Sequence, residues 1–166
     1  MEAITLKNVK VQELGEDFSS YGSYFNPKDC GPALSGDGPV QFYPDRILGL
    51  FEHSNIAAFS ALQLQPRDFK ITSSEIHLHT EETFGGFTKE VLFHVAPAGG
   101  LEPNLNQVKV FRLPAGWWAR VKRGVWHEAP FVVGSEATVG IVVLPPATYT
   151  HDCLVLNLPE PITINR

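Results

Sequence analysis

Short apolar runs separated by turn residues dominate the chain from residue 56 onward. Each run is rich in branched or aromatic side chains, and several alternate apolar with polar positions, as strands of a half-buried sheet do. Glycine and proline separate the runs at short intervals, which is typical of a sandwich or a barrel. The pattern therefore predicts an all-β fold with strands over 56–64, 71–79, 90–95, 108–113, 116–121, 137–144 and 149–158.

The N-terminal part follows another pattern. Apolar residues three or four positions apart (Val11, Leu14, Phe18 and Tyr21) fit one face of a helix. We therefore expect a short N-terminal helix within residues 9–21.

A long segment rich in glycine and proline comes next, over residues 26–46. It predicts an irregular loop, and its aromatic residues Phe42 and Tyr43 are expected to pack against the domain. The total of 166 residues is typical of one domain, so residues 1–166 are interpreted as a single domain. Fourteen glycines, thirteen prolines and eleven phenylalanines against one methionine favour strands and turns over a helical bundle.

Charge and composition exclude several classes of protein. The formal net charge of −5 argues against nucleic acid as a partner, because phosphate binding needs a basic field. The sequence contains no apolar run near 18 residues, so we expect no membrane span. The N-terminus lacks the features of a signal peptide, and Cys30 and Cys153 lie far apart. A cytoplasmic protein with two reduced thiols is the favoured interpretation, although one disulfide is an alternative.

The first candidate for chemistry is the alternating stretch Glu75-Ile76-His77-Leu78-His79. Side chains two apart in a strand point to the same face, so His77 and His79 are expected to project together, with Glu75 beside them. Imidazole is a common ligand of Zn, Fe, Ni and Cu. The alternative is a half-buried strand whose polar face lies in water. The acidic turn that follows contains Glu82, which either completes such a site or is simply solvated.

A second candidate lies in residues 114–127, where three cations accompany tryptophans. Arg120 and Lys122 are expected on one strand face, beside Arg123, and such a cluster suits a small carboxylate ligand. Alternatively, the stems of these side chains cover apolar surface. Gly124 predicts a tight turn that leads into Trp126 and His127.

These two motifs together resemble the metal-binding pattern of the cupin superfamily, in which His-x-His on one strand is followed by Gly-x-x-His, here Gly124 to His127. The segment from Arg123 to His127 also resembles the signature of the ureidoglycolate lyase family, formerly called ureidoglycolate hydrolase. Two further segments are similar to pieces of that family, namely Phe18-Ser19-Ser20-Tyr21-Gly22 and Val95-Ala96-Pro97-Ala98-Gly99. The resemblance covers about residues 4–158.

The chain departs from the family at three points. It has Leu78-His79 where the family has Arg-His, Thr83-Phe84-Gly85-Gly86-Phe87 where the family has a Thr-Gln-Ala-Phe stretch, and His127-Glu128 where the family has two histidines. The usual cupin carboxylate lies about five positions beyond the second histidine, where this chain has Phe84, so Glu82 is the nearest candidate.

The resemblance implies a cupin-type double-stranded β-helix, a jelly-roll barrel that holds one metal ion. It also implies cleavage of ureidoglycolate to glyoxylate and urea, and with it a role in allantoin catabolism within purine degradation. A divalent ion (Zn, Ni, Mn or Fe) bound by His77, His79, Glu82 and His127 would chelate the substrate and lower the pKa of its hydroxyl group.

The resemblance also suggests roles for single residues. The catalytic candidates are Glu82, His127, Arg123 and Lys122. Glu82 is preferred to Glu128 as the base, because neighbours in a strand face opposite sides. The candidates for substrate binding are Arg120, Trp126 and His94, of which His94 is alternatively a hydrogen-bonded core residue.

Other interpretations stay open at this point. They are a different metal-dependent cupin enzyme (a sugar isomerase or an Fe(II) dioxygenase), a non-catalytic cupin that binds a small acid or sugar, and a structural jelly roll. By analogy with cupins, which pair or exchange edge strands, we expect a homodimer.

Overall fold

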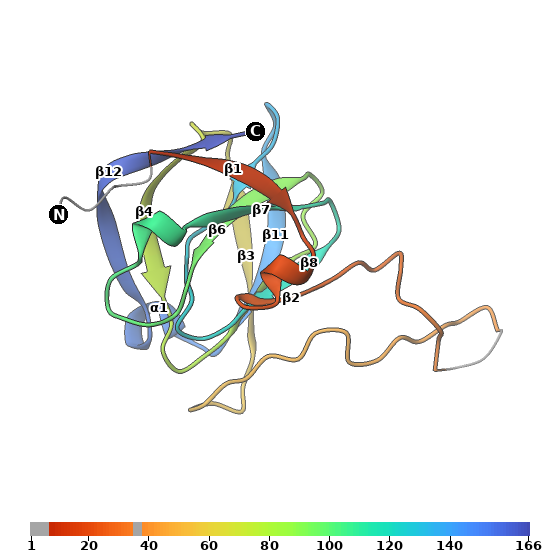
Figure 1. The fold of residues 1–166 in the computed structure, drawn as a ribbon. Coiled ribbons are helices and arrows are strands. Elements are labelled where there is room, and N and C mark those ends of the chain that lie inside the picture. Colours follow the sequence, from red (N-terminus) through yellow and green to blue (C-terminus); the bar gives the residue numbers. More distant parts are fainter. Residues whose placement is uncertain (1–6, 35–37) are drawn as a thin grey trace.

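The fold is described from a computed structural model of the chain, which describes residues 7–34 and 38–166. Strands make up most of the regular structure, and Figure 1 shows them curling around a common interior. The strands are β1 (Asn8–Glu13), β2 (Gly22–Phe25), β3 (Ala58–Leu64), β4 (Lys70–Ile76), β5 (Glu82–Gly85), β6 (Val91–Ala96), β7 (Lys109–Leu113), β8 (Trp118–Val121), β9 (Trp126–His127), β10 (Phe131–Val132), β11 (Thr138–Leu144) and β12 (Leu154–Asn165). The helical segments are η1 (Glu16–Phe18), η2 (Leu105–Gln107) and α1 (Thr148–His151).

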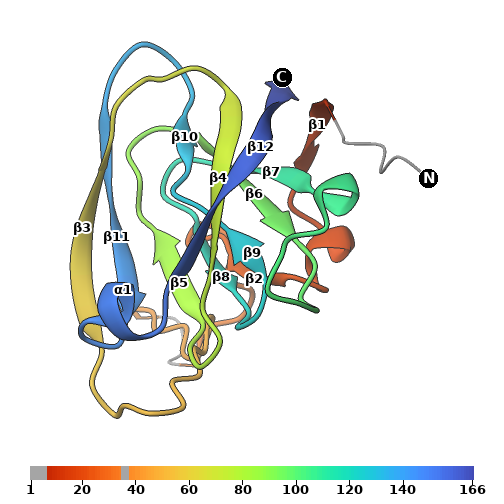
Figure 2. The same ribbon diagram turned by 90° about the vertical axis from the view of Figure 1, so that its left-hand side faces the viewer.

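The strands form two sheets. The larger sheet has the order β10-β6-β7-β1-β12-β4-β9, and an additional pairing of β6 with β9 closes its last six strands into a barrel. The smaller sheet has the order β2-β8-β5-β11-β3. In Figure 2, β3 and β11 stand at the left and β1 and β7 at the right, so the two sheets form opposite sides of the molecule. This arrangement confirms the predicted cupin-type β-barrel.

Each sheet contributes to a separate apolar core. One core fills the closed barrel and includes Ile76, Leu92 and Trp126. The other lies between β6 and β7 of the larger sheet and the smaller sheet, and it includes Phe84 and Phe93. Because successive side chains of a strand alternate between faces, strands of the barrel wall contribute to both interiors.

The N-terminal helix predicted within residues 9–21 is wrong. Residues Asn8–Glu13 form β1, which runs parallel to both of its neighbours, β12 and β7. A single turn of 3-10 helix over Glu16–Phe18 follows it. The three-to-four spacing arises because Phe18 and Tyr21 enter the core from this turn and the loop after it, rather than from a helix face.

Five of the predicted strands agree with the structure to within two residues at each end, namely β3, β6, β7, β8 and β11. The strand predicted over 71–79 ends earlier, at Ile76. The one predicted over 149–158 begins with the short helix α1 and becomes strand only from Leu154. The remaining strands were not predicted, and four of them have four residues or fewer (β2, β5, β9 and β10).

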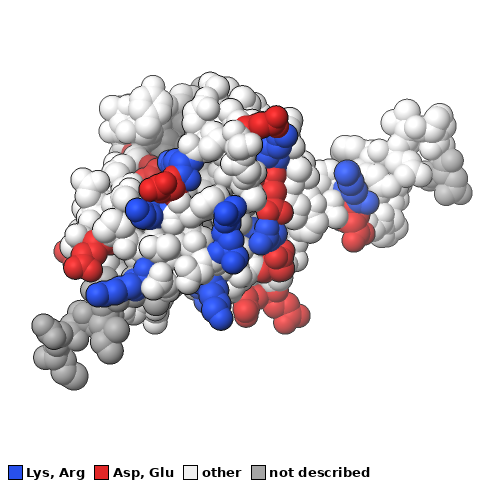
Figure 3. Space-filling model, turned by 90° about the horizontal axis from the view of Figure 1, so that it is seen from above, with Lys and Arg blue, Asp and Glu red and all other residues white. Residues whose placement is uncertain are grey.

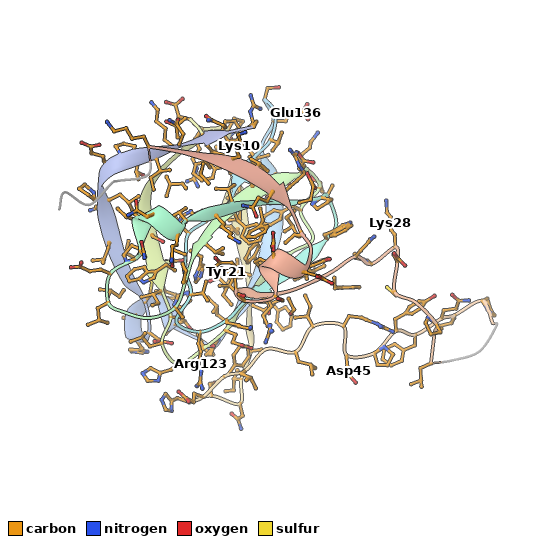
Figure 4. The ribbon with its side chains drawn as sticks, in the orientation of Figure 1. Lys10, Tyr21, Lys28, Asp45, Arg123 and Glu136 are labelled. Carbon is orange, nitrogen blue, oxygen red and sulfur yellow. The ribbon has the colours of Figure 1, made fainter. Side chains whose placement is uncertain are left out.

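An arm joins β2 to β3 and extends away from the barrel, as Figure 1 shows in orange. Lys28 and Asp45 lie on it, at a distance from the sheets (Figure 4). Its described residues contain no helix or strand, which confirms the predicted irregular loop. Tyr43 is partly buried, but Phe42 is 58% exposed, so the expected packing of Phe42 on the domain is wrong.

Charged side chains of both signs alternate on the face seen in Figure 3. Several are paired across neighbouring strands, such as Arg112 with Glu13 and Glu90. Pairing of this kind places charges of opposite sign side by side on this face. In the described part of the chain, no helix is both long and apolar enough to span a membrane. Cys30 and Cys153 are both free thiols.

A close contact between β11 and the chain after β5 gives a test of the core packing. A Cβ on Gly140 would lie 2.4 Å from Cε1 of Phe87 and 2.8 Å from the carbonyl oxygen of Gly85. Gly140→Ala should therefore overpack this core and lower the free energy of unfolding by about 1–3 kcal/mol, measured by urea denaturation.

The matched control is Gly15→Ala, because no atom lies within 4 Å of the Cβ it would add and its φ of −168° suits any residue. This variant should change the free energy of unfolding by less than about 0.5 kcal/mol. Equal effects of the two substitutions would contradict the packing described at Gly140.

Candidate active site

Four titratable side chains meet between the two sheets. They come from three places: Glu75 near the end of β4 with His77 just beyond it, His127 from β9, and Glu82 from the start of β5. One ligand atom of each residue lies within 4.8 Å of those of the other three. Both histidines are nearly inaccessible, whereas the side chains of Glu82 and Glu75 are 12% and 20% exposed. We call this group the interior cluster.

Strand pairing brings these residues together. In the pairing of β4 with β9, Glu75 lies opposite His127. The neighbour of His127, Trp126, is fully buried in the closed barrel, so alternation along β9 directs His127 to the other side of the wall. Glu82 pairs with Val121 on β8 and faces the same interior as Phe84 two residues later.

Backbone carbonyls fix the orientation of both imidazoles. The Nδ1–H of His77 donates to the carbonyl oxygen of Asp152 (2.5 Å), and that of His127 donates to the carbonyl oxygen of Val125 (2.9 Å). Because a carbonyl can only accept, these bonds leave Nε2 of each neutral ring with a lone pair. Both Nε2 atoms face Glu82, with distances to its Oε2 of 3.3 Å from His77 and 3.7 Å from His127.

The charges of the interior cluster depend on one another. Burial alone would raise the pKa of Glu82, but the two imidazoles outweigh burial and hold that pKa well below its usual value. Burial likewise opposes protonation of His127, but Glu82 and then Glu75 raise its pKa above the usual value. Glu82 is therefore ionised at neutral pH, and the neighbouring imidazole of His127 binds a proton more strongly than an ordinary histidine does.

Glu75 has a different environment from Glu82. Burial, only partly opposed by His127, raises the pKa of its carboxyl group. The Sγ of Cys153 donates to its Oε2 (3.1 Å), while its Oε1 lies 4.0 Å from Nε2 of His127. Burial and the Glu75 carboxylate raise the pKa of Cys153 to about 12, so this thiol keeps its proton.

The interior cluster fits a divalent metal ion. Nε2 of His127 is buried and has no hydrogen-bond partner among the described residues, although it lies among two carboxylates and a second imidazole. Histidine ligands of metals typically donate their other ring N–H to an outer acceptor, as both of these do. Two imidazoles and two carboxylates suit the borderline transition metals, including the Zn, Ni, Mn and Fe expected from the sequence.

His79 lies elsewhere. The strand that was expected to carry both histidines ends at Ile76, so His77 and His79 do not alternate along one strand. The ring of His79 is half-exposed and contacts Glu52 and His53 in the segment that precedes β3. The structure thus brings His77, Glu82 and His127 together as predicted, replaces His79 with Glu75, and places His79 in a second group.

None of the three predicted cations belongs to the interior cluster. Arg120 lies opposite Thr83 rather than Glu82, on the other face of the smaller sheet, where its Nη1 contacts Glu81 (2.7 Å). The ammonium group of Lys122 donates to the carbonyl oxygen of Ser19 (2.7 Å). Lys122 also lies beyond the end of β8, so it does not share a strand face with Arg120 as expected.

Arg123 is the third of these cations. It lies at the lower end of the barrel in Figure 4 and pairs with Glu52. Its side chain is 49% exposed, and it projects toward the segment before β3 rather than toward the interior cluster.

Trp126 and His94 belong to the core of the closed barrel. Trp126 is fully buried there, on the opposite side of the barrel wall from His127. The Oγ of Ser74 donates to the carbonyl oxygen of His127 (3.1 Å), so Nε2 of His94 donates to that Oγ (3.0 Å). Of the two roles left open for His94, the structure supports the hydrogen-bonded core histidine.

The comparisons with known proteins agree with this arrangement. The model of the ureidoglycolate lyase family, described as "Ureidoglycolate lyase", matches residues 9–165. The chain belongs to the ureidoglycolate lyase family. A search of curated proteins finds no match to the chain. Membership of the ureidoglycolate lyase family confirms the resemblance stated for the sequence and supports a lyase over the other cupin activities considered there.

His94 gives a pH-dependent test of this description. Burial lowers its pKa to about 3 in the folded protein, whereas an unfolded chain binds the proton near pH 6.5. Below pH 6.5 the unfolded state therefore binds more protons, and the free energy of unfolding falls as the pH falls. At pH 5 this loss should amount to about 2 kcal/mol.

The test compares wild type with His94→Gln in urea denaturation at pH 7 and pH 5. Glutamine retains a donor for Ser74 but does not titrate, so the variant should lose about 2 kcal/mol less stability over this interval. An identical pH dependence for both proteins would contradict the neutral, buried state of His94.

Proposed function

We propose that this chain cleaves ureidoglycolate to glyoxylate and urea at the interior cluster. The observation that supports this site most directly is the paired orientation of His77 and His127, whose Nε2 atoms both face the buried carboxylate of Glu82. Polar atoms that converge inside a protein are costly unless they bind something, which is why such clusters mark functional sites. The family match over residues 9–165 supplies the substrate.

The reaction moves protons and breaks one carbon–nitrogen bond without oxidation or reduction. The central carbon of ureidoglycolate bears a carboxylate, a hydroxyl group and a ureido nitrogen. The hydroxyl group loses its proton, its oxygen forms the carbonyl group of glyoxylate, and the bonding electrons leave with the nitrogen. That nitrogen takes up a proton to give urea.

We propose that His77, Glu82 and His127, with Glu75 beside them, hold a divalent metal ion. When bound, such an ion supplies positive charge that lowers the pKa of a hydroxyl group and stabilises the developing charge. The carbonyl groups of Asp152 and Val125 keep the two imidazoles in the orientation that such binding requires.

Glu75 is the residue that we propose to transfer the proton. It is the most exposed of the four members of the interior cluster, so a substrate can approach it without displacing the histidines. The thiol of Cys153 occupies one of its oxygens, and the other faces Nε2 of His127. Its carboxylate takes the proton from the substrate hydroxyl group and returns it to the leaving nitrogen.

Glu82 is the base expected from the sequence. In this proposal it instead positions the imidazoles of His77 and His127. Its Oε2 is shared between both imidazoles, so it fixes their separation. We assign no substrate contact to Arg120 or Lys122, because acceptors of the protein already bind their polar groups.

A homodimer and a cytoplasmic location remain proposals. The homodimer is supported by β3, an edge strand of the smaller sheet, on which Phe59 is 73% exposed. Edge strands with exposed apolar residues favour pairing with another chain. The cytoplasmic location is supported by the free thiols Cys30 and Cys153, which a reducing compartment preserves.

Two glutamates give a matched pair of variants for the proposed activity. Glu82→Gln removes the charge that both imidazoles contact, so release of glyoxylate from racemic ureidoglycolate should slow by at least about 100-fold. Glu128→Gln should stay within a few-fold of wild type, because Glu128 is not one of the four clustered residues and its carboxylate accepts a hydrogen bond from the hydroxyl group of Ser73 (3.0 Å).

Both variants should be assayed with added Zn²⁺, Ni²⁺, Mn²⁺ or Fe²⁺ and checked for folding by circular dichroism. Loss of activity in the folded Glu128 variant but not in the Glu82 variant would refute the proposed site. Absence of glyoxylate release from folded, metal-supplemented wild type would refute the proposed substrate.

A further inference from the structure

A second group of metal-ligating side chains lies outside the interior cluster. It comprises Glu52, His53 and His79, and one ligand atom of each lies within 4.8 Å of those of the others. All three side chains are exposed, so an ion can reach them directly from solvent. They line a hollow of about 380 Å³, whose lining also includes His151 and Asp152.

The backbone of this group is already held in place. The amide of Glu52 donates to the carbonyl oxygen of His79 (3.0 Å), and the preceding residue, Phe51, forms a β-bridge with Thr80. On its other side, the amide of His79 donates to the carboxylate of Asp152 (2.9 Å). Two chain segments that are distant in sequence therefore present their side chains in fixed positions, which lowers the entropic cost of binding an ion.

The side chains are arranged around a common point. The rings of His53 and His79 lie with their centroids 4.8 Å apart, and Nδ1 of His79 is 3.0 Å from Oε2 of Glu52. Nδ1 is therefore the nitrogen of His79 that faces Glu52, and an ion held by all three residues would replace this hydrogen bond. Two imidazoles and one carboxylate are a ligand set that zinc sites use, with further positions filled by water.

We propose that Glu52, His53 and His79 form a second metal site, which binds a borderline divalent ion such as Zn²⁺ and ties the segment before β3 to the turn before β5. Nitrogen ligands select zinc, nickel and copper over magnesium and calcium. The second metal site shares no residue with the interior cluster. This proposal is therefore independent of the reaction proposed for the interior cluster.

Arg123 sets the affinity of this second site. Its guanidinium pairs with Glu52, which places a positive charge beside one of the three ligands. An ion must therefore share Glu52 with Arg123 or displace it. We therefore expect the second site to bind a cation less tightly with Arg123 present than with Arg123 removed.

The experiment is a titration of the full-length chain with Zn²⁺, followed by calorimetry and by the ¹⁵N resonances of the histidine side chains. In wild type, the resonances of His53 and His79 should shift together as one ion binds. His79→Ala should weaken this binding event by at least about tenfold, because loss of a ligand costs no less than loss of an outer partner. Arg123→Gln should strengthen it.

Two further variants make the result specific. Glu82→Gln alters the interior cluster only, so it should leave the shifts of His53 and His79 unchanged. His151→Ala removes a neighbouring imidazole of the same hollow that lies outside the three-residue group, and it should also leave them unchanged. The second site is refuted if the two resonances do not respond to Zn²⁺, or if His79→Ala binds as well as wild type. The choice of ligands is refuted if His151→Ala abolishes binding.

Discussion

The two-residue strand β9 is the constraint on which the site depends. It pairs with β4 on one side and β6 on the other, and these pairings close the larger sheet into a barrel. Trp126 fills the barrel, and the alternation of side chains then forces His127 to the outer side of the wall, opposite Glu75. A shift of one residue in this pairing would turn His127 into the closed barrel and Trp126 out of it, toward the interior cluster. The packing of one large side chain thus sets the position of the functional one.

Electrostatics makes the interior cluster a binding site rather than a packing element. Burial disfavours the charged forms of Glu82 and His127, but the two imidazoles lower the pKa of Glu82, and Glu82 and Glu75 raise the pKa of His127. A pair of this kind is expensive to bury, and apolar residues of similar size would often stabilise a fold as well or better. The proposed binding role would account for its presence between two apolar cores, and the backbone acceptors of His77 and His127 suit the same role.

Much of this architecture could be predicted from the sequence, because strands with a regular alternation are local features. The five strands predicted within two residues are short apolar runs between turn residues, and some of them also alternate, as β8 does. β1 could not be recognised in this way, because its partners β7 and β12 are about a hundred or more residues away in the chain. Long-range pairing, not local propensity, makes it a strand.

The residues of the candidate site were likewise predicted only in part from the sequence. His77, Glu82 and His127 were found from motif spacing, but the assumption of one strand through His79 was wrong because β4 ends at Ile76. With His77 as the second residue of the motif, the carboxylate five positions on is Glu82, and Glu75 takes the place of the first histidine. The cations near residue 120 suggested a carboxylate site from composition alone, but the strand face on which Arg120 lies depends on a register that no local pattern reveals.

The central claim is that His127, held by β9, acts in carbon–nitrogen bond cleavage at the interior cluster. The most direct measurement is glyoxylate release from racemic ureidoglycolate by purified, metal-supplemented protein, compared with His127→Ala under the same conditions. Our account predicts release by the wild type and loss of at least about 100-fold in the variant, with the circular dichroism spectrum unchanged. A folded His127→Ala protein that releases glyoxylate at the wild-type rate would contradict it.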